Sequence, residues 1–343
     1  MRSGDPSSGV RRGGREEKTD RSLLLFLCLL YLLVHTASLA RGESRARAGS
    51  APPGVLSPRP AEAPYFARAR EHLRRGDAKQ AVKALEEGLA RHPKSVPLHY
   101  AAARLLAQER QFGRARAHYR RMAALAPRAV EPHFGLAQVA FVQRDYAASA
   151  AALQRVIRLQ PDSATAYAKL GAVYDRRFQT QRALDTLWKA IALAPDSEEA
   201  HFYLGDLLRR LSRLDEARAH LDRAIALNPG NARSHAALGE LWLQRQQDRE
   251  SLARAESAFT RALQLDPRLA SAHYGLGRLY LRQRRWSQAA EALRAALRLD
   301  PGLGRAHYAL AQAARRLGRP AEAAAHLEAF RRYRAARAGR PTP

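Results

Sequence analysis

Six histidines recur in register along the chain, and histidine is the side chain that most often binds transition metals. They are His99, His133, His201, His235, His273 and His307. Neighbouring repeats of a helical structure lie roughly 10 Å apart, whereas two imidazoles that share a zinc ion must each lie about 2 Å from it. We therefore expect these histidines to pack between helices, and we predict no metal site.

The sequence lacks the short motifs that carry the common catalytic chemistries. It has no phosphate-binding Gly-rich loop, no His-Glu-x-x-His, no Gly-x-Ser-x-Gly and no Cys-x-x-Cys-His. The single cysteine, Cys28, lies inside an N-terminal apolar run, so the body of the chain has no disulfide and no thiol nucleophile. We predict that the protein is not an enzyme, has no catalytic residue and uses no cofactor.

A regular series of prolines indicates how the chain is organised. Ala, Leu and Arg dominate the composition, which favours helix over sheet, and 46% of the residues are hydrophobic, enough to bury a core. The prolines recur every 34 residues, with one interval of 38, at Pro93, Pro127, Pro161, Pro195, Pro229, Pro267 and Pro301. Such a period indicates stacked helix–turn–helix units in which each proline ends a second helix.

The phased residues resemble those of the tetratricopeptide repeat family over about residues 62–337. The clearest unit has Tyr167, Leu170, Gly171 and Tyr174 in its first helix, then Ala183, Leu187, Ala190 and Pro195. The small residues let the two helices approach closely. The resemblance implies an all-α, right-handed superhelical solenoid of about eight repeats, starting near residues 62, 96, 130, 164, 198, 232, 270 and 304. The sixth repeat holds four extra residues within 244–252, between its helices.

In this family one face of the first helices lines a concave groove that binds other proteins. The resemblance places aromatic rings there, at Phe66, Tyr100, Phe134, Phe202, Tyr274 and Tyr308. Further along the same helices it places arginines, at Arg74, Arg104, Arg176, Arg209, Arg278, Arg282 and Arg315. The rings suit an extended or helical peptide, and rings together with guanidinium groups suit an acidic one. Two alternatives stay open: the rings could pack between helices, and the arginines could be solvated.

Two specialised versions of the family groove are absent from the matching positions. The Lys-then-Asn pair that clamps a chaperone's C-terminal carboxylate is replaced by Phe66 with Arg70 and by Tyr100 with Arg104. The asparagine ladder of O-GlcNAc transferase is also missing, since positions such as Ala101, Gly135 and Lys169 hold other residues. The predicted partner is therefore a protein or peptide of another kind.

The charge balance is strongly basic and supports a second function. The formal net charge is +27, with 59 Lys and Arg against 32 Asp and Glu, and six of the basic residues are lysines. Such a charge attracts polyanions, so the alternative function is binding of nucleic acid or an anionic envelope polymer. An arginine-rich composition also follows from GC-rich codon usage, and we expect nucleic acid to be the less favoured partner.

The N-terminus has the plan of an export signal. Arg21 is followed by an unbroken apolar run at residues 23–34, and Ser38 and Ala40 are the small residues needed for cleavage after residue 40. Residues 1–40 are predicted to be a signal peptide or an uncleaved membrane anchor, residues 41–61 a disordered linker and residues 338–343 a tail. The repeat region is thus expected to be secreted or periplasmic, or anchored with its repeats outside the cytoplasm.

Overall fold

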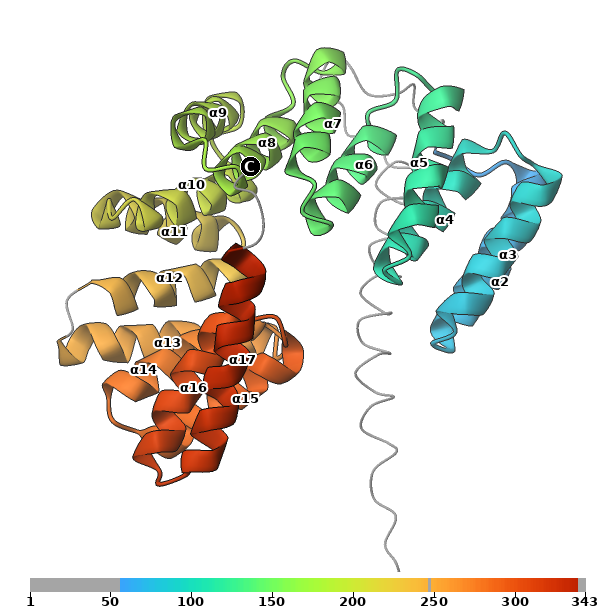
Figure 1. Ribbon diagram of the computed structural model, residues 1–343. Helices are drawn as coiled ribbons and strands as arrows, with labels where there is room; N and C mark the ends of the chain where they lie inside the picture. The colour runs from blue at the N-terminus through green and yellow to red at the C-terminus, as the bar shows by residue number, and fades with distance from the viewer. Residues whose placement is uncertain (1–55, 246–247, 339–343) are drawn as a thin grey trace, which may run out of the picture. The chain divides into compact units, whose positions relative to one another are not determined.

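The computed structural model describes residues 56–245 and 248–338 of the chain. Within these ranges it consists of a 3-10 helix, η1, and sixteen α-helices, α2 to α17, without a strand (Figure 1). The chain divides into two compact units, an N-terminal unit up to Asp162 and a C-terminal unit from Ser163 onward. The predicted signal or anchor at residues 1–40 lies outside the described residues.

The helices of the N-terminal unit form three consecutive pairs. Their bounds are η1 Pro60–Glu62, α2 Ala63–Arg74, α3 Ala78–Arg91, α4 Val96–Gln108, α5 Phe112–Leu125, α6 Glu131–Val142 and α7 Tyr146–Leu159. Each first helix packs against the second helix that follows it, and α3 and α5 pack in turn against the next first helix. The buried side chains between them include Leu98 and Leu106.

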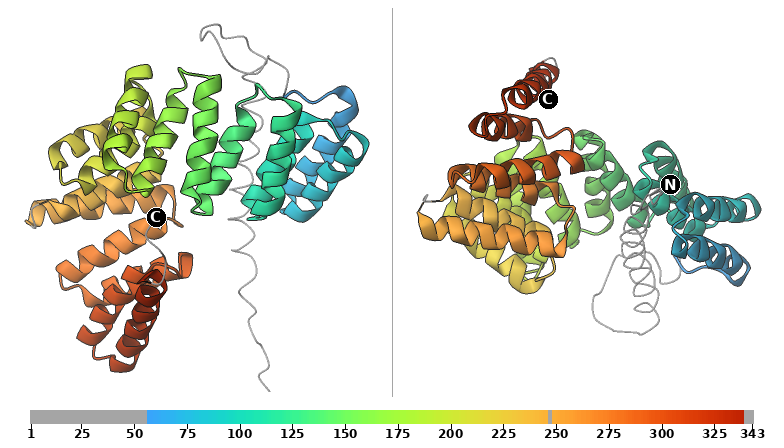
Figure 2. Two further views of the ribbon diagram at one scale, coloured as in Figure 1. Left: turned by 45° about the horizontal axis from the view of Figure 1, so that its top comes forward. Right: turned by 90° about the horizontal axis from the view of Figure 1, so that it is seen from below.

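The C-terminal unit continues the same arrangement through five pairs (Figure 2). Their bounds are α8 Ala164–Arg176, α9 Thr180–Leu193, α10 Glu198–Arg210, α11 Leu214–Leu227, α12 Ala232–Gln244, α13 Arg249–Leu265, α14 Ala270–Arg282, α15 Trp286–Leu299, α16 Gly304–Arg316 and α17 Pro320–Ala338. The predicted all-helical repeat architecture is confirmed. None of the helices in the described ranges combines the length and the apolar character that crossing a membrane requires.

Local chemistry explains where the helices begin and end. Ser95 and Ser197 cap α4 and α10 by accepting a hydrogen bond from the backbone amide three residues on. In seven repeats the turn from first to second helix passes through one residue in the left-handed region, which is glycine at Gly76 and Gly318. Phe178 occupies the same turn of α8–α9 with a φ of 58°. Each of these turns therefore needs one residue that tolerates this backbone.

Close approach of the two helices within a pair depends on glycine, as the sequence predicts. A Cβ placed on Gly171 would lie 2.5 Å from Cγ of Leu187 in the second helix. At Gly277 it would lie 2.5 Å from Cγ of Leu293. Both leucines are fully buried. The backbones of α8 and α14 thus contact the leucine of the next helix directly, which sets the spacing inside these pairs.

Candidate functional site

The aromatic residues predicted for the groove lie in different environments. In the N-terminal unit, Phe66 and Tyr100 are half-buried and pack against the core, and the guanidinium of Arg104 lies 5.6 Å from the ring centroid of Tyr100. Phe134 is half-buried on α6. The predicted arginine of α2, Arg74, forms an ion pair of 3.1 Å with Glu71. These rings are therefore partly used by packing inside the unit.

Phe202 of the C-terminal unit leaves little surface for a partner. It is only 7% exposed, and the guanidinium of Arg233 lies 4.7 Å from its ring centroid. By contrast, Tyr308 on α16 is 46% exposed, and Tyr274 on α14 is half-buried. The open aromatic surface among the predicted positions of this unit thus lies toward its C-terminal end.

Two acidic residues toward the C-terminal ends of α8 and α10 are neutralised by arginines. Arg209 pairs with Asp206 at 2.8 Å, and Arg210 pairs with Asp175 at 2.6 Å. Burial alone would raise the pKa of Asp206, but Arg209 and Arg210 more than offset it and hold that pKa below its usual range. Arg176, at the end of α8, is exposed. Arg209 is therefore bound within the fold, whereas Arg176 faces solvent.

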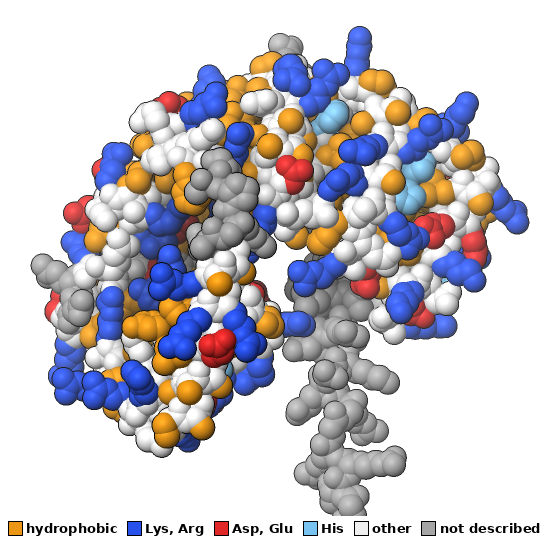
Figure 3. Space-filling model, viewed as in Figure 1, with side chains coloured by type: hydrophobic (Ala, Val, Ile, Leu, Met, Phe, Trp, Pro, Cys, Tyr) orange, Lys and Arg blue, Asp and Glu red, His pale blue; other side chains and the backbone are white. Residues whose placement is uncertain are grey.

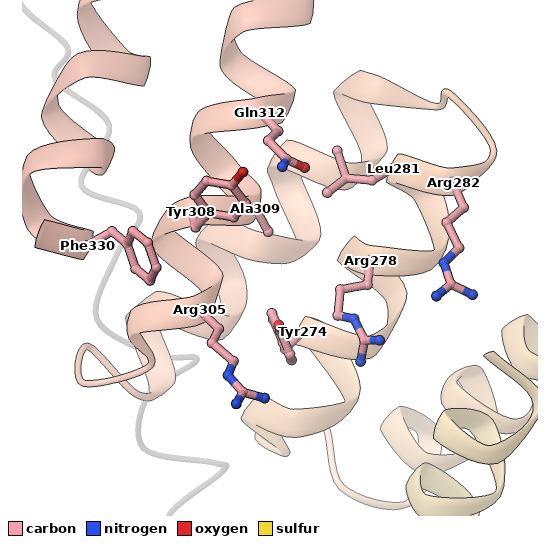
Figure 4. Close-up of a pocket in the computed structure, with 9 residues that line it drawn as sticks. All are labelled: Tyr274, Arg278, Leu281, Arg282, Arg305, Tyr308, Ala309, Gln312 and Phe330. Atoms are coloured by element: carbon pink, nitrogen blue, oxygen red, sulfur yellow. The ribbon is translucent and has the colours of Figure 1, made fainter. Parts of the chain in front are cut away.

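A pocket of about 330 Å³ opens among the last helices of the C-terminal unit (Figure 4). Helix α14 supplies Tyr274, Arg278 and Arg282, and α16 supplies Arg305 and Tyr308. The remaining lining residues are Leu281, Ala309, Gln312 and Phe330. In Figure 4 Tyr274 lies between Arg305 and Arg278, while Phe330 of α17 faces Tyr308. We call this site the arginine–aromatic pocket.

The arginine–aromatic pocket is basic, because three arginines and no acidic residue line it among the described residues. Arg278 pairs with Glu240 at 2.7 Å, and its guanidinium lies 5.5 Å from the ring centroid of Tyr274. Arg282 donates to the backbone carbonyl of Leu243. Burial, helped by the nearby Arg278, lowers the pKa of Arg282. Arg305 is exposed at the rim and is free to meet a ligand.

The apolar wall of the pocket is built by two rings in contact. The centroids of Tyr308 and Phe330 lie 5.2 Å apart with their planes tilted by 42°. Burial raises the pKa of Tyr274, so its hydroxyl stays neutral and can donate a hydrogen bond. Guanidinium groups bind carboxylates through paired hydrogen bonds, and aromatic rings bind apolar side chains. The pocket can therefore hold a carboxylate next to an apolar group.

The structure brings four of the predicted residues together and adds others. Tyr274, Arg278, Arg282 and Tyr308 line the pocket, whereas Arg315 is exposed on α16 outside it. Sequence reasoning missed Arg305 as a site residue, although it stands three residues before Tyr308 and so on the same face of a helix. It also missed Phe330, because nothing in the repeat pattern places the terminal helix against the first-helix face.

A second hollow lies at the first repeat, and its central arginine is paired with an acid. It is lined by Pro64, Tyr65, Arg68, Glu87, Ala90 and Arg91. Arg68 and Glu87 form an ion pair of 2.9 Å, and the Arg68 guanidinium lies 5.1 Å from the ring centroid of Tyr65. Because its central arginine is already neutralised, this hollow is less suited to a charged ligand.

The surface as a whole carries many more basic than acidic side chains. Figure 3 shows Lys and Arg scattered over the visible face rather than gathered in one stripe. Many of the arginines form ion pairs, such as Arg285 with Glu256 at 2.9 Å. In the described part of the chain no three His, Cys, Asp or Glu side chains are grouped so that they could hold a metal ion.

Comparisons with known proteins identify the repeat. Family models described as tetratricopeptide repeats match residues 100–164, 134–198, 241–304 and 276–339. Two further models of this repeat match residues 198–231 and 62–105. No curated protein matches the chain.

Solved structures share the fold at low sequence identity. A tetratricopeptide repeat protein from Parabacteroides merdae has a TM-score of 0.61 at 13% identity, covering 74% of this chain and 98% of that one. The Cut9–Hcn1 heterotetramer of the APC/C has a TM-score of 0.62 at 15% identity, and the match covers 79% of this chain and 52% of that one. The human IFIT1 dimer with PPP-AAAA has a TM-score of 0.61 at 18% identity, and the match covers 78% of this chain and 68% of that one.

Proposed function

This chain belongs to the tetratricopeptide repeat family, and we propose that it is a non-enzymatic scaffold that binds an acidic peptide segment of a partner protein. The coarse function follows from the repeats, because stacked helical pairs present extended surfaces for other proteins. We place the main contact at the arginine–aromatic pocket. There a partner's carboxylates would meet Arg282 and Arg305 while an apolar side chain packs on Tyr308 and Phe330.

The observation that carries this proposal is the unbalanced charge of the pocket. Glu240 neutralises Arg278, but Arg305 makes no hydrogen bond or ion pair within the described residues. Arg282 is exposed, and its guanidinium donates to a backbone carbonyl and forms no ion pair among the described residues. Positive charges that lack a carboxylate partner, beside the exposed ring of Tyr308, are stabilised by an anionic ligand, which supplies the missing counter-charge. An acidic peptide provides both the charge and the apolar contact.

Peptide selection tests the proposal without knowledge of the natural partner. Peptides selected from a random phage library on the full chain are expected to be enriched in Asp and Glu next to aromatic residues or leucine. Arg305→Glu should weaken the selected peptide's affinity by about tenfold to a hundredfold, since it removes a charge-assisted hydrogen bond and adds repulsion. Fluorescence anisotropy of the labelled peptide gives the affinity.

Arg298→Glu is the matched control for that variant. Arg298 is an exposed arginine of α15, outside the pocket, and its replacement makes the same change in net charge. We expect this variant to bind the selected peptide within about threefold of the unchanged chain. Equal losses in the two variants would mean that overall charge, and not the pocket, governs binding. Selection of peptides that are not enriched in Asp and Glu would contradict the proposal that the partner is acidic.

The alternative is a polyanion-binding protein, favoured by the net charge of +27. A protein of similar fold, the human IFIT1 dimer, has been solved with PPP-AAAA. In our chain the basic residues are scattered, and many of them pair with acids. A surface of this kind offers a continuous anion fewer free charges than the net value suggests. Salt dependence separates the two functions, as argued below.

We also propose that the protein acts outside the cytoplasm. The support is the sequence alone: an apolar run at residues 23–34 followed by small residues at Ser38 and Ala40. N-terminal sequencing of the mature protein tests it. A chain that begins at Arg41 indicates cleavage and release, whereas an intact N-terminus in the membrane fraction indicates an anchor. An intact N-terminus in the soluble cytoplasmic fraction contradicts export.

A further inference from the structure

Three repeats hold a histidine of their first helix against a histidine of their second helix. The pairs are His99 with His118 on α4 and α5, His201 with His220 on α10 and α11, and His307 with His326 on α16 and α17. In every pair the two Nδ1 atoms lie 2.9 Å apart. Each pair thus joins the two helices of one repeat by a single nitrogen–nitrogen hydrogen bond.

The first two pairs have defined tautomers. Nε2 of His99 lies 3.1 Å from the carbonyl oxygen of Pro93, and Nε2 of His201 lies 2.9 Å from that of Pro195. A carbonyl oxygen only accepts, so both Nε2 atoms carry a proton. In the neutral ring Nδ1 is then an acceptor. His118 and His220 must therefore donate from Nδ1, and their own Nε2 atoms stay unprotonated.

This arrangement accepts one proton easily and a second proton only at a cost. The first proton binds Nε2 of His118 or His220 and leaves the connecting bond in place, now charge-assisted. The second proton has to bind Nδ1 of His99 or His201, which already accepts that bond. Two N–H groups would then face each other across 2.9 Å. Two positive rings with centroids about 5 Å apart would also repel.

The charged groups around the N-terminal pair partly oppose one another. Burial lowers the pKa of His99, against the Pro93 carbonyl, which raises it, and Arg121 lowers it further. Burial is also the main cause that lowers the pKa of His118, and His99 and Arg114 lower this pKa further. Glu86 raises it. Because Arg114 is bonded to Glu86, the carboxylate is not free to stabilise a doubly charged pair.

The two pairs of the C-terminal unit have similar surroundings. Burial and then His201 lower the pKa of His220, against Glu216, which is itself paired with Arg213 at 2.6 Å. The ring of Trp188 lies edge-on to His220, with centroids 5.2 Å apart.

For His326, burial and then His307 lower the pKa, Glu322 raises it and Arg294 lowers it. When the pKa of a histidine is lower in the folded state than its unfolded value of about 6.5, the neutral ring stabilises the fold. This contribution is fully present above about pH 6.5. This stability is lost as the pH falls through the folded-state pKa.

A metal ion fits these pairs less well than a proton does. Zinc bonds to imidazole nitrogen are about 2.0–2.1 Å long, so a tetrahedral ion needs its two nitrogens about 3.3 Å apart. The observed separation is 2.9 Å, and the described residues provide no group of three ligands. The proton is therefore the occupant that the geometry favours.

We propose that the three histidine pairs are acid-sensitive connections, which hold the two helices of their repeat together in neutral solution and part them when a second proton binds. The third pair joins α16 to α17, the helices that carry Tyr308 and Phe330. Parting these helices would open the apolar wall of the arginine–aromatic pocket. That consequence for a partner rests on the proposed function, whereas the opening of the helix pairs does not.

Histidine titration in the unaltered full chain tests the proposal directly. Hydrogen–deuterium exchange at the imidazole C2 position, followed by mass spectrometry in EDTA, reports the titration of each histidine. One member of each pair should bind its proton at least about tenfold more weakly than the unpaired His235 and His273. If all members of the pairs titrate like His235 and His273, the proposal is wrong.

A set of variants then links titration to stability. One variant combines His118→Ala, His220→Ala and His326→Ala. Alanine already occupies the same position in two other repeats, at Ala152 and Ala292. The free energy of unfolding is measured in urea from about pH 8 to about pH 5. Its dependence on pH should be weaker in the variant than in the unaltered chain, by about one bound proton per pair. The control His235→Ala with His273→Ala should keep the original slope.

Each outcome of this second experiment decides the question. A triple variant with the original pH slope overturns the proposal, and a flatter slope supports it. If the triple variant does not fold, the titration of the unaltered chain decides alone. No peptide is present in either measurement, so failure here leaves the proposed function standing, and failure of peptide binding leaves the histidine pairs standing.

Discussion

Single residues set how closely the two helices of a repeat approach each other. The period of 34 residues located Gly171 and Gly277, and a Cβ at either would clash with a buried leucine. It also located the histidines of the first helices, but not the pairs that three of them form. The signal was present: His118, His220 and His326 each stand 19 residues after one of them. These pairs join the two helices of a repeat, whereas the register of 34 residues relates only positions on the first helices.

The close contact at Gly171 gives a prediction for stability. Gly171→Ala should lower the free energy of unfolding by about 1–3 kcal/mol, because the new Cβ would overlap Leu187 and force the helices apart. Urea denaturation followed by circular dichroism measures the loss. Gly113→Ala is the control, since a Cβ on Gly113 in α5 would meet nothing within 4 Å. It should cost nothing, or add a few tenths of a kcal/mol from helix propensity. Equal losses at the two positions would contradict the packing account.

At the scale of helices and turns, the repeat pattern predicts the architecture but not the accessibility of individual side chains. The predicted rings recur at equivalent positions, yet Phe202 is covered by Arg233 while Tyr308 is open. The difference arises from the neighbouring helices: Arg233 of α12 lies over the ring of Phe202, whereas α17 meets Tyr308 through the ring of Phe330. Such contacts depend on residues outside the repeat consensus, so the period cannot reveal them.

The turn between α8 and α9 gives a prediction at this scale. Phe178 has a left-handed backbone, with a φ of 58°, and its side chain is 78% exposed. Phe178→Gly removes the steric cost of that backbone, about 1–2 kcal/mol, against a smaller gain in entropy of the unfolded chain. We expect the free energy of unfolding to rise by roughly 0.5–1 kcal/mol, measured by urea denaturation. Arg177→Gly, one residue earlier and at negative φ, should instead lower it.

At the scale of the whole molecule, net charge is a poor guide to the partner. The chain carries +27, but arginines such as Arg209, Arg210 and Arg278 are already paired with acids. The sequence predicts the charge and the all-helical fold, and neither distinguishes a peptide-binding protein from a polyanion-binding one. What distinguishes them is the position of Arg305, unpaired within the described ranges, beside the exposed ring of Tyr308, which only the folded chain brings together.

Salt dependence of binding follows from that distinction. A polyanion held by six or more phosphate contacts should lose about a thousandfold in affinity between 50 mM and 200 mM salt. The selected peptide, held by a few arginines and by aromatic contacts, should lose about tenfold or less. Anisotropy titrations of the peptide and of single-stranded RNA at both salt concentrations measure this. RNA binding that is tight at about 50 mM salt and about a thousandfold weaker at about 200 mM would favour the alternative function.

The location of the bound peptide tests the central claim most directly. A photoreactive benzoylphenylalanine replaces Gln312, which lines the arginine–aromatic pocket, or Arg298, which lies outside it. After irradiation with the labelled acidic peptide, we predict a cross-linked product from the chain modified at position 312 and none from the chain modified at 298. Cross-linking at 298 alone, or equally at the two positions, would contradict binding in the pocket.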